Sequence, residues 1–207
     1  DSYAQKQLER FTRACTMTQS MGFEPRWRHT ACSAAAILYP ATHFNMIRLG
    51  IALYGLWPSQ TALVHARALG RRLALRPAMT WKTIVAQVKR VSRGTPVGYG
   101  LSEKLKRDSV IAVLPVGYAD GYDRGFSRQS EVLIHGKRCR IIGRVCMNMC
   151  VADVTDISRV RTEDVVVLLG RQKTDRITAD ELAEKIGTIN YEIVNRVNPL
   201  ISRIVVA

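Results

Sequence analysis

In the stretch Leu114-Pro-Val-Gly-Tyr-Ala-Asp-Gly-Tyr-Asp-Arg-Gly125, a Gly-Tyr-Ala-Asp-Gly turn directly follows an apolar run, Val110 to Val116, that has the composition of a β strand. The stretch places Tyr118 on a tight turn directly after Gly117. Glycine accepts backbone angles that other residues resist, so the turn leaves the phenol unshielded. A phenol held in this way can transfer protons when a cationic neighbour favours the phenolate. The same pattern also fits a tyrosine that only packs or caps a turn, so it does not identify a function by itself.

The composition is that of a globular protein. The chain has 207 residues, enough for one or two domains, and 47% of them are hydrophobic. No apolar run approaches the ~18 residues that a membrane span needs, and the first residues lack the layout of a secretion signal. The five cysteines show no Cys-x-x-Cys spacing, so we expect buried thiols rather than disulfides or a metal site. These features predict a cytoplasmic protein.

The charge balance is strongly basic, with 31 Lys and Arg against 17 Asp and Glu and a formal net charge of +14. Such an excess suits nucleic acid or an anionic surface. The basic residues are scattered, however, and the densest cluster, Arg67 to Arg76, has no interleaved aromatics. We therefore expect neither nucleic acid nor membrane as a partner, and a charge that favours solubility and attracts an anionic cofactor. A non-catalytic basic β-barrel binding module remains an alternative.

The first 60 residues have an alternating β-α-β pattern. After a loosely periodic helix over residues 2–21, we expect short strands at 26–30 and 45–49 with a helix at 33–38 between them. This rhythm is typical of a parallel sheet with crossover helices. It is too short to form a complete barrel.

From about residue 80 the sequence is typical of an all-β domain, closed or partly closed as a barrel. A Thr-x-x-Glu capping box at Thr178 predicts a helix that Gly187 ends, and a last helix starts near Thr188. The predicted division is an α/β part at 1–60, a linker at 61–79 and a β-rich domain at 80–207. The expected strands lie at 83–91, 110–116, 131–134, 139–151 and 165–169.

Four segments, in this order and spacing, resemble the alanine racemases of the pyridoxal-phosphate barrel type. They are Met46-Ile-Arg-Leu-Gly-Ile-Ala-Leu-Tyr-Gly-Leu-Trp-Pro-Ser59, Gly117-Tyr-Ala-Asp-Gly121, Arg144-Val-Cys-Met-Asn-Met149 and Thr188-Ile-Asn-Tyr-Glu192. Each segment alone is weak evidence, but the likeness extends from about Gln7 to Arg203.

The resemblance implies the fold. Alanine racemases have an eight-stranded α/β barrel followed by a β-rich domain, and this chain resembles the portion from about the sixth barrel helix onward. The expected fold class is therefore mixed: the C-terminal remnant of an α/β (TIM-type) barrel, followed by a mainly antiparallel β-barrel-like domain. The sequence itself leaves open whether Asp1 is a native start.

The resemblance also implies the chemistry, which is the interconversion of L- and D-alanine for the bacterial cell wall. Two bases on opposite faces of the substrate exchange its α-proton, and pyridoxal 5'-phosphate serves as the electron sink. Tyr118 matches the base that acts on L-alanine and would be offered to a partner's active site, so a homodimer is expected. The other base is a lysine on the first barrel strand, which also carries the cofactor as a Schiff base. No lysine here lies in a matching motif, so we expect the 207 residues alone to be inactive.

The remaining expected contacts concern the cofactor and the substrate. Arg48 matches an arginine that faces the pyridine nitrogen of the cofactor; because arginine stays protonated, it can only donate there, which suits simple proton exchange. The phosphate contacts would come from Ser33, Gly50, Ile51 and Tyr191. The backbone N–H of Met147 would help to hold the substrate carboxylate.

Two positions depart from the family pattern. Asn148 stands where aspartate is usual, and Cys32 stands where asparagine commonly precedes the serine. Neither change affects an expected proton carrier or phosphate donor. They leave open a serine or broad-specificity amino-acid racemase of the same fold.

Overall fold

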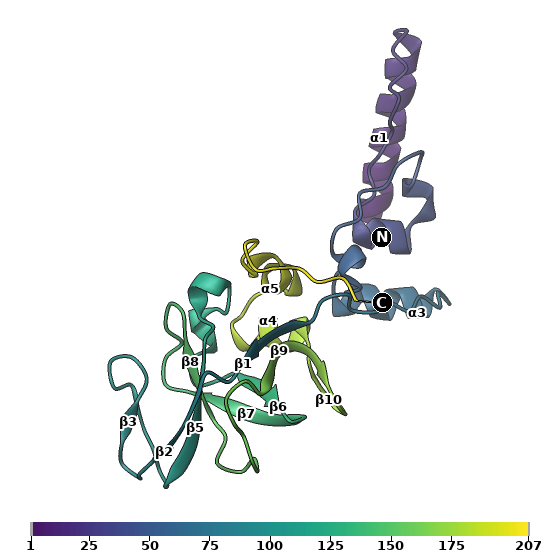
Figure 1. Ribbon diagram of the computed structural model, residues 1–207. Coiled ribbons are helices and arrows are strands. Elements are labelled where there is room, and N and C mark those ends of the chain that lie inside the picture. The colour runs from purple at the N-terminus through teal and green to yellow at the C-terminus, as the bar shows by residue number, and fades with distance from the viewer. Residues whose placement is uncertain (1, 207) are drawn as a thin grey trace. The chain divides into compact units, whose positions relative to one another are not determined.

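The structure is a computed structural model that describes residues 2–206. The chain divides into two units, Asp1–Ala78 and Met79–Ala207 (Figure 1). We call them the N-terminal unit and the C-terminal unit. No helix of the described residues is long and apolar enough to cross a membrane.

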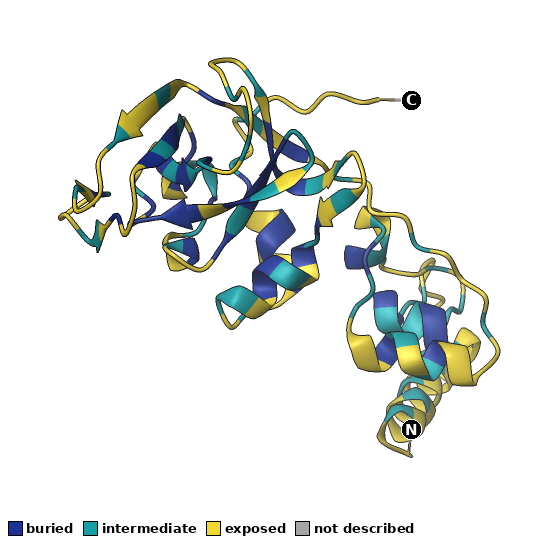
Figure 2. Cartoon of the chain, turned by 90° about the horizontal axis from the view of Figure 1, so that it is seen from below, coloured by how far each residue is buried: buried dark blue, intermediate teal, exposed yellow. Residues whose placement is uncertain are grey.

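The N-terminal unit is built from helices and turns around a small core. Helix α1 buries none of its residues and is drawn mostly in the colour of exposed residues in Figure 2. The core lies instead between α2 and α3, where Ile37 and Leu38 pack with Ala62 and Ala66. The elements are α1 (Ser2–Ser20), α2 (Ser33–Leu38), α3 (Gln60–Ala68), and the 3-10 turns η1 (Pro40–Thr42) and η2 (Ile51–Tyr54).

The two short strands that we expected in this unit do not form. Residues 26–30 and 45–49 contain no strand, although the segments lie side by side. The Asn45 side chain links them, accepting from the Arg28 N–H at 2.6 Å and donating to the Arg26 carbonyl at 2.9 Å. A strand needs a ladder of backbone partners, and here an amide side chain takes the place of part of it. The prediction of strands at these positions is wrong for the described chain.

The stretch 61–79, expected to be a linker, begins as helix α3. Ser59 caps it, and the hydroxyl accepts from the Ala62 N–H at 3.0 Å. The end of the stretch then runs back beside η2, with the Ala78 N–H donating to the Tyr54 carbonyl at 2.9 Å. The polar and basic composition of this stretch did not indicate a helix, because only two alanines, Ala62 and Ala66, form its buried face.

The C-terminal unit contains one eight-stranded sheet, in which every pairing is antiparallel. The order is β1-β9-β6-β7-β8-β5-β2, with β10 added beside β9. A two-stranded sheet, β3 with β4, shares no strand pairing with it, although Val97 of β3 packs against Ile111 and Ile142 of the large sheet. The strands are β1 (Trp81–Ile84), β2 (Gln87–Val91), β3 (Pro96–Val97), β4 (Glu103–Lys104), β5 (Ser109–Leu114), β6 (Glu131–Ile134), β7 (Lys137–Ile142), β8 (Cys150–Asp153), β9 (Val165–Gln172) and β10 (Asp175–Ile177).

The two ends of this strand order are consecutive in sequence. We expected one strand over residues 83–91, but the segment bends and forms β1 against β9 and β2 against β5. At the bend the Val85 N–H donates to the Asp164 carbonyl and the Ala86 N–H to the Val113 carbonyl. The sheet thus curves back to its starting segment, which makes this unit β-rich and barrel-like.

Three aromatic rings meet in the mainly aliphatic interior of the C-terminal unit, where Figure 2 shows buried residues along the strands. Tyr122 is fully buried, and its ring centroid lies 4.8 Å from that of Phe126 and 6.0 Å from that of Trp81. Its hydroxyl donates to the buried Ser130 hydroxyl at 3.2 Å. Burial raises the pKa of Tyr122 well above its ordinary value, so this tyrosine is a core residue and not a proton carrier.

Two short helices follow the sheet, α4 (Ala179–Lys185) and α5 (Asn190–Arg196). The Thr178 hydroxyl accepts from the Glu181 N–H at 3.0 Å, which confirms the expected cap. The Glu181 carboxylate does not return to Thr178, because it pairs with Arg138 at 2.6 Å. The second half of the expected capping box is therefore replaced by an ion pair that ties α4 to β7.

Candidate active site

The Tyr118 turn, residues 117–121, contains the 3-10 turn η3 (Tyr118–Asp120) and comes shortly after β5. The Asp120 carboxylate accepts from the Gly117 N–H at 2.9 Å, and Gly121 ends the turn with a φ of 98°, which favours glycine. The Tyr118 side chain remains 43% exposed. The sequence thus produces a rigid turn that presents a phenol to its surroundings.

The structure brings Met147 to this turn. The Tyr118 N–H donates to the Cys146 carbonyl at 3.0 Å, and the Ala119 N–H donates to the Met147 carbonyl at 2.9 Å. A Cβ at Gly117 would lie only 2.2 Å from the Cys146 carbonyl oxygen, so this close approach requires glycine. Among the described residues, the Met147 N–H donates to no acceptor. It is thus available for an anionic group such as a carboxylate.

A hollow of about 370 Å³ lies beside Tyr118 and is lined by Gly121, Asp123, Arg124 and Arg196. Arg196 pairs with the Asp123 carboxylate at 2.5 Å and is therefore largely neutralised. The hollow can hold a small polar molecule, and Arg124, which takes part in no ion pair among residues 2–206, adds a positive charge to its lining.

A second group of expected residues meets in the N-terminal unit. The Ser33 hydroxyl accepts from the Gly50 N–H at 3.0 Å and from the Ala52 N–H at 3.3 Å. Arg48 lies beside the same segment, since its N–H donates to the Ala31 carbonyl at 2.9 Å and its guanidinium reaches the Thr30 carbonyl at 3.4 Å. Three of the four expected phosphate contacts, Ser33, Gly50 and Ile51, therefore lie together next to Arg48.

The donors in this group fit an anionic phosphate. Because Ser33 accepts two hydrogen bonds, its own hydroxyl hydrogen remains available to donate. Ile51 begins η2, so its N–H has no acceptor within that turn. A Cβ built at Gly50 would meet no atom within 4 Å, which leaves open space beside these donors. The chemistry of the set therefore suits a phosphate group, and the Arg48 guanidinium adds a cationic donor beside it.

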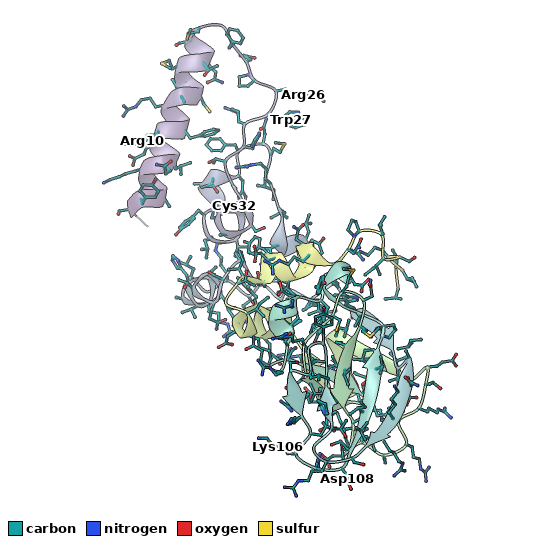
Figure 3. The ribbon with its side chains drawn as sticks, turned by 90° about the vertical axis from the view of Figure 1, so that its left-hand side faces the viewer. Arg10, Arg26, Trp27, Cys32, Lys106 and Asp108 are labelled. Carbon is teal, nitrogen blue, oxygen red and sulfur yellow. The ribbon has the colours of Figure 1, made fainter. Side chains whose placement is uncertain are left out.

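Tyr191 belongs to the C-terminal unit. It is the second residue of α5, and 37% of it is exposed. Cys32, which departs from the family pattern, is exposed directly before α2 and is labelled in Figure 3. The expected site residues are thus divided between the two units, with Tyr118, Met147 and Tyr191 in the second.

Two family models match the chain. The model for the alanine racemase N-terminal domain matches residues 1–58, and the model for the alanine racemase C-terminal domain matches residues 78–205. The chain belongs to the alanine racemase family. The second match alone covers more than half of the 207 residues.

Curated alanine racemases are similar over almost the whole chain. The alanine racemase of Leptospira interrogans is 38% identical over 205 residues, which are 99% of this chain and 53% of that protein. The alanine racemase of Methanococcus maripaludis is 43% identical over 203 residues, 98% of this chain and 52% of that protein. This member of the alanine racemase family therefore spans about half the length of the curated relatives it matches.

Solved structures of alanine racemases are also similar to this chain. The alanine racemase of Bacillus anthracis, with bound L-Ala-P, has a TM-score of 0.85 at 36% identity over 95% of this chain and 49% of that one. The alanine racemase of Clostridium difficile, in complex with cycloserine, has a TM-score of 0.84 at 31% identity, covering 95% of this chain and 50% of that one. The identities are high enough for the likeness to concern the family as well as the fold.

The structure of this alanine racemase family member also shows a tyrosine that sequence reasoning missed. Tyr99 lies between Gly98 and Gly100, both with positive φ, in the loop between β3 and β4, and is 73% exposed. A Cβ at Gly100 would lie 3.0 Å from a guanidinium nitrogen of Arg144, so a cation adjoins the loop. Within residues 2–206, Arg144 takes part in no ion pair. The Gly-Tyr-Gly pattern was a signal for Tyr99 of the same kind as the one read at Tyr118.

Proposed function

We propose that this chain is part of a pyridoxal-phosphate-dependent alanine racemase that interconverts L- and D-alanine by two-base proton transfer. The observation that carries the proposal is the match to both alanine racemase domain models, in order, over residues 1–58 and 78–205. The names of the relatives support alanine as the substrate. We place the enzyme in the cytoplasm, and its N-terminal unit within an α/β barrel that the rest of the racemase completes.

The N-terminal unit would hold the cofactor. Ser33, Gly50 and Ile51 would donate to the phosphate, and Arg48 would donate to the ring nitrogen. The open space at Gly50 and the free Ile51 N–H support this assignment. The resemblance implies the Tyr191 hydroxyl as a further phosphate donor. When bound, pyridoxal 5'-phosphate supplies the electron sink that makes the α-proton of alanine removable.

Met147 and a tyrosine of the C-terminal unit would act on the substrate. The Met147 N–H would hold the alanine carboxylate, and the phenolate would take or return the α-proton on one face. Tyr118 is the tyrosine that the sequence predicts for this role, and it lies beside a hollow that Arg124 lines. Tyr99 is the second candidate, because it is more exposed than Tyr118 and an unpaired arginine, Arg144, adjoins its loop as well.

The second base would be the lysine that resemblance places on the first barrel strand. We propose that the 207 residues alone do not racemise alanine for want of that lysine. We also propose a homodimer in which the tyrosine serves the partner's active site. With Asn148 in place of the usual aspartate, serine is the alternative substrate to be compared with alanine.

The test uses the completed enzyme, which we define as residues 1–207 fused to the part of the Leptospira interrogans racemase that the chain does not span. We expect it to racemise L-alanine with pyridoxal 5'-phosphate, and to prefer alanine to serine. Tyr99→Phe and Tyr118→Phe are then compared, since each removes only a hydroxyl. The variant that loses at least about 100-fold in kcat identifies the base, in line with the typical contribution of acid–base catalysis. Full activity in both variants would refute a tyrosine base.

A further inference from the structure

The segment that follows α5 holds the Tyr118 turn by its backbone. The side-chain amide of Asn198 donates to the Ala119 carbonyl at 3.0 Å. The Asn198 backbone N–H donates to the Asp120 carbonyl, also at 3.0 Å. One residue, 78 positions along the chain from Asp120, thus binds both residues that follow Tyr118.

Asn198 is itself fixed in orientation. Its side-chain oxygen accepts from the Leu200 N–H at 2.9 Å, and its carbonyl accepts from the Ile201 N–H at 3.1 Å. Because the oxygen is occupied by Leu200, the NH₂ group must face Ala119. If the Asn198 amide were inverted, its oxygen would face the Ala119 carbonyl oxygen and its NH₂ group would face the Leu200 N–H, so both hydrogen bonds would be lost.

The end of α5 also packs tightly on the turn. A Cβ at Gly121 would lie 2.1 Å from the Arg196 carbonyl oxygen, so the two backbones are in direct contact. The ion pair between Arg196 and Asp123 spans the same boundary at 2.5 Å. The Tyr118 turn and the end of α5 therefore form one packed body, and displacement of one moves the other.

A chain of hydrogen bonds connects Asn198 to Met147 through Ala119. Asn198 binds the Ala119 carbonyl, the Ala119 N–H binds the Met147 carbonyl, and the Met147 N–H faces no acceptor in the described part of the chain. We propose that Asn198 is a positioning residue for the substrate carboxylate, acting through Ala119 on the Met147 N–H. The inference rests on the proposed function, since Met147 binds a carboxylate only if the enzyme acts on an amino acid.

The test is Asn198→Asp in the completed enzyme. Aspartate keeps the oxygen that accepts from Leu200 but replaces the NH₂ group with an oxygen that faces the Ala119 carbonyl. We expect the Ala119 amide to exchange with solvent about tenfold faster, because its turn opens more often. We expect KM for L-alanine to rise about tenfold with kcat within about twofold, as for a contact made equally in ground and transition states.

Gln172→Glu is the matched control. The Gln172 amide also bridges two backbone groups, donating to the Val165 carbonyl at 2.9 Å and accepting from the Gly136 N–H at 2.7 Å, but it lies at the end of β9. It should leave both readouts unchanged.

Each outcome has a distinct meaning. Faster exchange of the Ala119 amide with unchanged KM and kcat would show that Asn198 only stabilises the Tyr118 turn, and it would overturn the proposal. A fall in kcat without a rise in KM, unchanged exchange, or an equal effect of Gln172→Glu would also overturn it. If the unsubstituted enzyme racemises no alanine, the proposed function fails, and amide exchange alone then decides whether Asn198 holds the turn.

Discussion

Gly117→Ala tests whether the contact between the Tyr118 turn and the Met147 loop depends on the missing side chain. The new Cβ would lie 2.2 Å from the Cys146 carbonyl oxygen and 2.3 Å from that of Met147. Ordinary contact begins near 3.4 Å, so the turn must move away by roughly 1 Å. The φ of Gly117 is −150°, which alanine accepts, so the cost is steric and not conformational.

The displacement determines the magnitude. Moving the turn by about 1 Å breaks the hydrogen bonds from Tyr118 to Cys146 and from Ala119 to Met147, each contributing about 1 kcal/mol. Residual overpacking adds about 1–2 kcal/mol. We therefore expect the free energy of unfolding of the C-terminal unit to fall by about 3–4 kcal/mol.

Urea unfolding, followed by circular dichroism, measures this loss. Gly125→Ala is the control, because a Cβ there would meet only the side chains of Ile186 and Asp123, at 2.9 and 3.0 Å. Those side chains can move, so its effect should stay below about 1 kcal/mol. Equal destabilisation by the two substitutions, or a loss below about 1 kcal/mol for Gly117→Ala, would refute the reasoning.

Two further predictions concern stability. Arg138 binds the carboxylates of Glu181, Glu131 and Asp175 at 2.6–3.0 Å, and these bonds raise its pKa. Arg138→Met should therefore lower the free energy of unfolding by about 2 kcal/mol at low salt, after allowance for solvent screening. An equal loss in 1 M salt would contradict an electrostatic cause. Burial raises the pKa of Cys139 from 9.0 to about 12. The thiol of the unfolded chain ionises at lower pH than the buried thiol, so its contribution to the free energy of unfolding should be complete below pH 9 and fall by about 1.4 kcal/mol per pH unit between pH 9 and 12. In Cys139→Ala the free energy of unfolding should fall less steeply over this range, by the same amount. An unchanged slope in Cys139→Ala would refute the assignment to this thiol.

The sequence predicted those elements whose local and tertiary preferences agree. β6 occurs at the residues expected, because Glu131-Val-Leu-Ile134 is both β-prone and buried between β7 and β9. Helix α2 likewise runs from Ser33 to Leu38 as expected. In both cases the local preference of the segment agrees with the structure that its distant partners, β9 and α3, require.

Failures arose where distant partners decide the structure. Whether residues 26–30 and 45–49 form strands depends on neighbours for their backbone groups, which local sequence does not reveal. The bend at Val85 is determined by two distant backbone acceptors, the Asp164 carbonyl for the Val85 N–H and the Val113 carbonyl for the Ala86 N–H. β10 was missed because Asp175-Arg-Ile177 is mostly polar and is held by pairing with β9.

The site was partly predictable for the same reason. The structure brings Ser33 next to Gly50 and Tyr118 next to Met147, and the roles expected for these residues stay predictions. The cation beside Tyr99 was not predictable, because Arg144 lies 45 residues further along the chain. The role of Asn198 depends on a contact across 79 residues.

The most direct test of the account is α-proton exchange of L-alanine in heavy water with pyridoxal 5'-phosphate. The 207-residue chain is measured alone and as the completed enzyme. We predict no exchange by the chain alone, and deuterium incorporation with racemisation by the completed enzyme. Exchange by the chain alone would contradict the claim that the second base and cofactor-bearing lysine lie outside it, and no exchange in either sample would contradict the proposed racemase.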